Sequence, residues 1–139
     1  MLATDVDPAA VVCARRNGVR ALLGSLDGPL PASIKGRVDV MTAVVPYVPA
    51  EELHLLPRDV LAYEPRHALN GGSGGTTFLK QVAQISADWL ALGGRVLLEL
   101  GGDQADAVAG TLEGAGLLDI RVHRDRDGDD RAIEGRLLP

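Results

Sequence analysis

A nearly continuous apolar run over Arg37–Val45 ends in Pro46-Tyr47, and this transition constrains the fold more than any other feature. An apolar run of this length around Asp39 predicts a strand buried on both faces, as in a parallel sheet covered by helices. Proline has no backbone N–H to donate to a neighbouring strand, so Pro46 predicts that the strand ends before it. The pattern therefore predicts a strand that runs into a loop at the edge where an α/β enzyme places its chemistry.

The remaining segments alternate between strand and helix signals. Asp7-Pro8 supplies an N-cap and a proline at the first helical position, and Asn17-Gly18 supplies a left-handed end. Apolar residues at helical spacing predict the longest helix over 76–92, ended by Gly93-Gly94, and Asp127-Gly128 is typical of a hairpin turn. The expected strands span 2–7, 19–23, 37–45, 95–100, 118–123 and 132–138, and the expected helices span 9–16, 76–92 and 103–115, with a short helix near 51–55.

This order predicts an α/β fold with a mostly parallel sheet, helices on both faces and an antiparallel last strand. The chain has 139 residues, enough for one hydrophobic core, so we expect a single domain over 1–139. The segment 46–70 is expected to be otherwise irregular because it contains four prolines.

Composition argues against several kinds of partner. A net charge of −5 does not favour capture of nucleic acid or an anionic membrane, and 3% aromatic residues provide no base-stacking platform. The apolar runs are far shorter than a membrane span. The single cysteine, Cys13, excludes an internal disulfide and is expected to be a small core residue on the first helix. We therefore expect a soluble, cytoplasmic protein.

Asp5 is a candidate ligand-binding residue because it lies at the carboxyl end of the first expected strand, just before a helix. In doubly wound folds an acidic residue at such a position hydrogen-bonds ribose hydroxyls. The alternative is that Asp5 or Asp7 caps the helix. Asp7 directly precedes Pro8 and is the better cap, which leaves Asp5 available for a ligand.

Several segments, in order and at suitable intervals, resemble the release-factor N(5)-glutamine methyltransferases. Val44-Val45-Pro46-Tyr47 is similar to the Asn-Pro-Pro-Tyr motif of methyltransferases that modify amide and amino nitrogens. The resemblance covers essentially the whole chain and rests on Ala3–Asn17, Val38–Pro49, Glu64-Pro65 followed by Ala68-Leu69, and Gly94–Glu99 with Gln104.

The resemblance implies a class I, S-adenosylmethionine-dependent methyltransferase sheet with strand order 3-2-1-4-5-7-6. The implied reaction is methyl transfer to a glutamine side-chain amide nitrogen of a protein, with a translation release factor as the suggested substrate. In this family the motif's asparagine and adjacent backbone carbonyls orient the NH2 group. Carried over residue by residue, the resemblance assigns Asp5 to the ribose, Ser25 and Leu26 to the adenine side, and Val44, Pro46 and Tyr47 to the acceptor pocket.

Three departures from the family pattern leave a second hypothesis open. Val44 replaces the asparagine and cannot accept a hydrogen bond, and Ser25 replaces an acidic adenine contact, unless Asp27 substitutes through a register shift. The Asp/Glu-x-Gly-x-Gly motif, its strand and the following helix have no counterpart in the chain. We therefore expect an N-terminally truncated relative whose inner strands pair directly or keep open edges. The alternative function is a catalytically inactive binding or partner-dependent domain, or a gene fragment.

The other signals are weaker. Asn70–Gly75 is expected to be a flexible surface loop, and Glu99 is equally compatible with a site residue and a helix cap. The segment His123–Glu134 partly resembles a calcium loop, but flanking strands favour a solvated hairpin turn. The histidines and Cys13 show no metal-ligand spacing, so no metal is expected.

Overall fold

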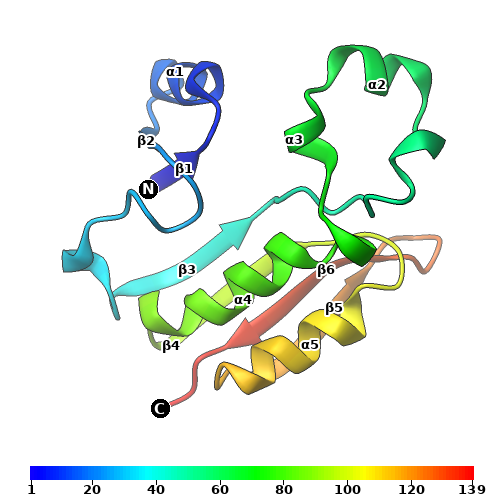
Figure 1. Ribbon diagram of the computed structural model, residues 1–139. Helices are drawn as coiled ribbons and strands as arrows, with labels where there is room; N and C mark the ends of the chain where they lie inside the picture. Colours follow the sequence, from blue (N-terminus) through cyan, green and yellow to red (C-terminus); the bar gives the residue numbers. More distant parts are fainter. The chain divides into compact units, whose positions relative to one another are not determined.

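The computed structural model describes all 139 residues, which form two compact units, Met1–Lys35 and Gly36–Pro139 (Figure 1). The first unit contains a two-stranded sheet with one helix, and the second contains a four-stranded sheet with its helices. A single domain over residues 1–139 stays a prediction.

In the first unit, strand β1 (Leu2–Asp5) pairs in parallel with β2 (Arg20–Leu23), and helix α1 (Pro8–Arg16) connects them. Asp7 is the N-cap of α1 and accepts a hydrogen bond from the backbone N of Ala9 at 2.8 Å, as predicted. The chain continues through a short 3₁₀ helix, η1 (Ala32–Ile34).

The expectation of a buried Cys13 was wrong, because its side chain is exposed. Val11 is the buried residue of α1, and Ala21 on β2 is buried as well. Cys13 follows Val11 by two residues, which corresponds to a rotation of about 200° around the helix axis. Its side chain therefore faces away from the side on which Val11 is buried.

The second unit is built on a sheet with strand order β3-β4-β6-β5. Strand β3 pairs in parallel with β4, and the other pairings are antiparallel. The orders β2-β1 and β3-β4-β6-β5 correspond to the 3-2 and 4-5-7-6 parts of the expected topology. The predicted α/β methyltransferase fold with an antiparallel last strand is confirmed, and the sheets contain both parallel and antiparallel pairings. These strands are β3 (Val38–Ala43), β4 (Leu90–Glu99), β5 (Leu118–Arg124) and β6 (Asp130–Arg136).

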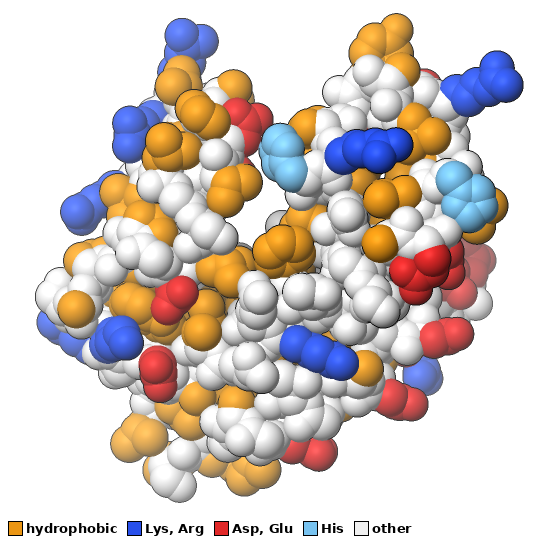
Figure 2. Space-filling view, viewed as in Figure 1, with side chains coloured by type: hydrophobic (Ala, Val, Ile, Leu, Met, Phe, Trp, Pro, Cys, Tyr) orange, Lys and Arg blue, Asp and Glu red, His pale blue; other side chains and the backbone are white.

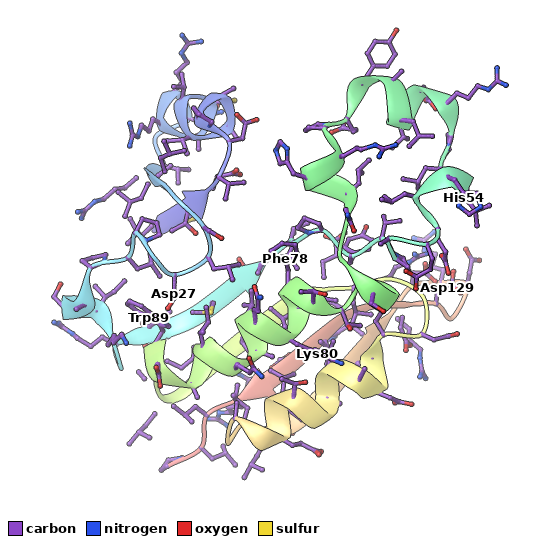
Figure 3. The ribbon with its side chains drawn as sticks, viewed as in Figure 1. Asp27, His54, Phe78, Lys80, Trp89 and Asp129 are labelled. Carbon is purple, nitrogen blue, oxygen red and sulfur yellow. The ribbon has the colours of Figure 1, made fainter.

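Helices α4 (Thr77–Trp89) and α5 (Ala105–Gly114) pack against each other and against this sheet (Figure 1). Trp89 lies at the carboxyl end of α4 and is 2% exposed, and Phe78 lies near its other end (Figure 3). None of the helices combines the length and apolar character needed to span a bilayer. The core of the unit consists of apolar residues from both helices and the sheet, among them Leu79, Val82, Ala83, Val96, Leu98, Val108, Leu112 and Ile133.

The opposite face of the sheet carries exposed apolar residues, so the expectation that β3 is buried on both faces was wrong. Val40 on β3 is 64% exposed, and Leu97 on β4, which lies on the same face as Val40, is 36% exposed. The physical reason is that α4 and α5, which supply the helical contacts of this sheet, pack on its other face.

The segment between β3 and α4 holds more helix than predicted. It contains η2 (Leu53–Leu55), α2 (Arg58–Tyr63), α3 (Arg66–Leu69) and η3 (Ser73–Gly75). Pro57 and Pro65 are the N-cap residues of α2 and α3. Two of the four prolines that predicted irregular structure therefore stand at the starts of helices.

Gly93 and Gly94 lie inside β4, which corrects the prediction that they end the preceding helix. The helix already ends at Trp89. A Cβ on Gly94 would lie 2.7 Å from the carbonyl oxygen of Val38, so close approach of β3 explains this glycine.

The different burial of two leucines on β4 predicts unequal costs for their substitution by alanine. Leu98 is 0% exposed and Leu92 is 73% exposed. Leu98→Ala should lower the free energy of unfolding by about 2–5 kcal/mol because it leaves a cavity. Leu92→Ala should change it by about 0.5 kcal/mol or less. Urea denaturation followed by circular dichroism measures both, and equal losses would contradict this arrangement.

Candidate functional site

The carboxyl ends of the paired strands β1 and β2 bring Asp5 close to the Gly24–Leu26 loop. Asp5 pairs with Leu23, and its carbonyl accepts a hydrogen bond from the backbone N of Gly24 at 2.9 Å. Thr4 Oγ1 donates to the carbonyl of Leu26 at 2.8 Å. Leu26 has φ +47°, an uncommon conformation for a residue with a side chain, and this hydrogen bond helps to hold it. The structure thus places Asp5, Ser25 and Leu26 at one end of this sheet.

The Asp5 side chain is exposed and already takes part in a local turn. Its Oδ1 accepts a hydrogen bond from the backbone N of Asp7 at 2.8 Å, while Asp7 caps α1. The second carboxylate oxygen of Asp5 accepts no hydrogen bond within the chain. A carboxylate can accept about four hydrogen bonds, so this group retains acceptor capacity for a ligand hydroxyl.

In the second unit, a pocket of about 320 Å³ lies where β3 and β4 end. Val44 and Tyr47 line this pocket together with Leu97, Glu99 and Arg131. The structure therefore brings two of the three predicted acceptor residues to one pocket. Pro46 lies outside its lining, and the Pro46 carbonyl faces the glycine segment at Gly71.

The buried side chain of Gln104, 6% exposed, fixes the backbone at Tyr47. Its Nε2 donates to the carbonyl of Tyr47 at 2.7 Å and to the carbonyl of Gly74 at 3.2 Å. Its Oε1 accepts from the backbone N of Gly101 at 3.1 Å. Sequence reasoning missed this role of Gln104. The available signal was an amide side chain next to glycines at the end of a strand, where backbone groups need partners.

The glycine segment is packed against the Pro-Tyr loop, so the expectation of a flexible surface loop was wrong. Gly71 and Gly75 are buried, and the backbone N of Gly71 donates to the carbonyl of Val48 at 2.8 Å. A Cβ on Gly75 would lie 2.1 Å from the carbonyl oxygen of Tyr47 and 2.4 Å from Nε2 of Gln104. Glycine is required here because a backbone and a side chain approach it closely.

Tyr47 and Glu99 form the polar wall of the pocket. The Tyr47 hydroxyl donates to Oε1 of Glu99 at 3.1 Å. Burial raises the pKa of Tyr47 above its ordinary value, and the hydrogen bond and negative charge of Glu99 raise it further. Gln104, and not Glu99, is the N-cap residue of α5. Of the two interpretations of Glu99, the structure favours the pocket position.

The acidic turn between β5 and β6 is held by internal partners. Asp125 Oδ2 accepts from Nε of Arg131 at 2.6 Å, and its Oδ1 accepts from the backbone N of Asp127 and Asp129. Hydrogen bonding from Arg131 lowers the pKa of Asp125. The turn joins two strands, as predicted for a solvated hairpin. No group of three or more His, Cys, Asp and Glu side chains in the chain is placed to hold a metal ion.

The packing of Gly75 predicts that an added methyl group there is costly. Gly75 has φ +67°, and its Cβ would overlap Tyr47 and Gln104. Gly75→Ala should lower the free energy of unfolding by about 2–5 kcal/mol through strain and overlap. Gly110→Ala is the control, because a Cβ at this helical position meets nothing within 4 Å. It should raise stability by up to about 1 kcal/mol. Thermal unfolding checks both expectations, because the melting temperature should fall in Gly75→Ala and stay the same or rise in Gly110→Ala.

The Tyr47–Glu99 hydrogen bond predicts that the Tyr47 hydroxyl loses its proton at a higher pH than an ordinary tyrosine. Tyr63→Phe leaves Tyr47 as the remaining tyrosine, and its phenolate absorbance should appear above the usual pKa of about 10. Glu99→Gln should move the midpoint down toward that value. The folded pKa is the raised one, so the stability from this group is present below about pH 10 and lost as pH rises through the folded pKa. An unchanged midpoint in Glu99→Gln would show that the contact is absent in solution.

Curated proteins with similar sequences share one description. The chain is 38% identical over 140 residues to a release factor glutamine methyltransferase of Cereibacter sphaeroides, covering 98% of the chain and 50% of that protein. It is 35% identical over 143 residues to the enzyme of the same description from Geobacter sulfurreducens, covering 99% of the chain and 49% of that protein. The chain thus spans about half the length of these curated relatives. No family model matches the chain.

Solved structures agree with the fold. A methyltransferase from Pyrococcus furiosus matches with a TM-score of 0.67 at 18% identity, covering 99% of the chain and 62% of that protein. The structure of the E. cuniculi Mtq2–Trm112 complex matches with a TM-score of 0.57 at 16% identity, covering 97% of the chain and 82% of the matched protein. The sequence matches, with which the strand orders agree, show that this chain belongs to the release factor glutamine methyltransferase family of class I methyltransferases.

Proposed function

We propose that the pocket beside Pro46-Tyr47 receives the side-chain amide nitrogen of a protein glutamine, which is methylated from S-adenosylmethionine. The observation that carries this proposal is the pocket at the carboxyl ends of β3 and β4, where Val44 and Tyr47 stand at the motif positions. The descriptions of the curated relatives name release factors, so a translation release factor is the proposed acceptor.

The residues at the end of β1 and β2 fit the nucleoside part of this cofactor. Asp5 is exposed and has acceptor capacity for a ribose hydroxyl, and Ser25 and Leu26 offer a hydroxyl and an apolar side chain for the adenine side. When bound, S-adenosylmethionine would supply an electrophilic methyl group on a sulfonium, whose sulfur leaves as a neutral thioether, and the methylated amide nitrogen would release one proton to solvent. No segment of the chain corresponds to the Asp/Glu-x-Gly-x-Gly motif, so the proposed contacts come from these three residues.

The contribution of the chain to methyl transfer is positioning. An amide nitrogen is a weak nucleophile because its lone pair is delocalised into the carbonyl, so alignment of the reacting atoms matters most. Gln104 and Gly75 hold the Tyr47 backbone in one conformation. The Tyr47 ring forms part of the wall that packs beside the substrate side chain, and its hydroxyl donates a hydrogen bond to Glu99.

The alternative function is a non-catalytic member of the family that binds a partner. Val44 favours this alternative, because it is 73% exposed, apolar, and unable to accept a hydrogen bond where the motif has asparagine. An amide NH2 left without an acceptor in a closed site costs on the order of 1–3 kcal/mol.

Two measurements on the full chain test the proposal. Calorimetry should detect binding of S-adenosylmethionine, and Asp5→Asn should weaken it by about tenfold because a charged acceptor for the ribose is lost. Asp59→Asn makes the same charge change at an exposed residue of α2 and should leave binding unchanged.

Mass spectrometry of a blocked glutamine peptide incubated with the chain and S-adenosylmethionine should then show addition of one methyl group. Absence of binding at millimolar cofactor would reject the enzymatic function for this chain and favour the non-catalytic alternative.

A further inference from the structure

The strand register places Glu99 directly beside Val44. Ala43, the last residue of β3, pairs with Leu98 on β4, and the next residue along the chain is Val44 after β3 and Glu99 on β4. Neighbouring strands lie about 4.8 Å apart, and residues in register point to the same face. Both side chains line the same pocket of about 320 Å³. A carboxylate therefore lies next to the position where the motif's asparagine would offer its carbonyl.

The Glu99 carboxylate has acceptor capacity to spare. Its Oε1 accepts one hydrogen bond, from the Tyr47 hydroxyl, and its Oε2 accepts none within the chain. A carboxylate provides about four acceptor positions. The side chain is exposed, so the pocket leaves it accessible to a ligand.

The one cation in the pocket lining does not neutralise Glu99. Arg131 binds Asp125 through Nε at 2.6 Å and Asp129 through a terminal nitrogen at 3.0 Å. Its charge is thus compensated by two aspartates on the β5–β6 turn, and Glu99 remains as an additional negative charge. Figure 2 shows acidic side chains on the part of the second unit where Figure 3 labels Asp129, which belongs to this turn. The surroundings of the pocket favour a hydrogen-bond donor over an acceptor or an anion.

We propose that Glu99 supplies the hydrogen-bond acceptor that Val44 lacks, so that the pocket selects a substrate side chain with an NH2 group. The inference rests on the proposed function, because it concerns the acceptor pocket of that reaction. Glu99 holds an N–H of the substrate without removing its proton, and Tyr47 keeps the carboxylate in place through the shared hydrogen bond. Glu99 is thus a substrate-binding residue, and the replacement of asparagine by valine moves the acceptor from β3 to β4.

Two blocked peptides that differ in one group measure this selection without cofactor. One contains glutamine, and the other contains 5-oxonorleucine, in which a methyl group replaces the NH2 group. Titration of the ¹⁵N-labelled chain should move the backbone signals of Ala43, Leu97 and Glu99. The wild-type chain should bind the glutamine peptide about tenfold more tightly, because a charged acceptor distinguishes an NH2 group from a methyl group.

Variants at Glu99 assign that preference to the carboxylate. Glu99→Ala should bind both peptides equally, and Glu99→Gln should restore part of the preference because its amide oxygen still accepts a hydrogen bond. Glu113→Ala removes the same charge from an exposed position of α5 and should keep the wild-type preference. Circular dichroism of Glu99→Gln verifies that the fold is retained.

The outcomes separate this inference from the proposed function. An undiminished preference in Glu99→Ala overturns the role of Glu99, even where S-adenosylmethionine binds and the glutamine peptide is methylated. A wild-type chain that binds neither peptide at millimolar concentration, or binds both equally, also overturns it. Failure to bind S-adenosylmethionine, with the peptide preference intact, instead rejects the enzymatic function and leaves Glu99 as an NH2-binding residue.

Discussion

The candidate acceptor pocket depends on the three hydrogen bonds of one buried amide side chain. Gln104 joins the carbonyls of Tyr47 and Gly74 to the backbone N of Gly101, and so connects three loops that are distant in sequence. Each of these backbone groups would otherwise need another partner, and an unsatisfied buried polar group costs about 1–3 kcal/mol. Gly75 permits the close approach because it has no Cβ. The position of the Tyr47 ring, and with it the wall of the pocket, follows from this arrangement.

Parallel pairing explains why the candidate residues lie at strand ends. Residues in register on parallel strands end at the same edge, so β1 and β2 bring Asp5 to the Ser25–Leu26 loop, and β3 and β4 bring Val44 to Glu99. The residues proposed to contact the nucleoside of the cofactor therefore lie at the strand ends of the first unit. The residues proposed to contact the acceptor side chain lie at the strand ends of the second unit. The open face of the second sheet leaves the pocket in contact with solvent, and Val44 in its lining is 73% exposed.

Sequence patterns predicted part of the site and missed the part that depends on long-range contacts. Val44 and Tyr47 were found because they are the first and last residues of one four-residue motif, and both line the pocket. Gln104 and Tyr47 are 57 residues apart, so no local pattern reveals their hydrogen bond. The same reason explains the glycine segment, which local composition describes as flexible, although buried contacts with the Pro-Tyr loop hold it. Cys13 was misplaced because an apolar side chain on a short helix does not reveal which side of the helix is buried.

The sequence by itself determined the order of the strands and of the three longest helices, the capping of α1 by Asp7, the abrupt end of β3 and the family to which the chain belongs. These properties follow from local periodicity, from the restricted backbone of proline, and from motifs in a fixed order. The tertiary structure decided which face of the second sheet is covered, which glycines are packed against other backbone, and that Glu99 lies beside Val44. Those properties arise where segments far apart in the chain meet, and pairing register and side-chain packing fix them only in the folded protein.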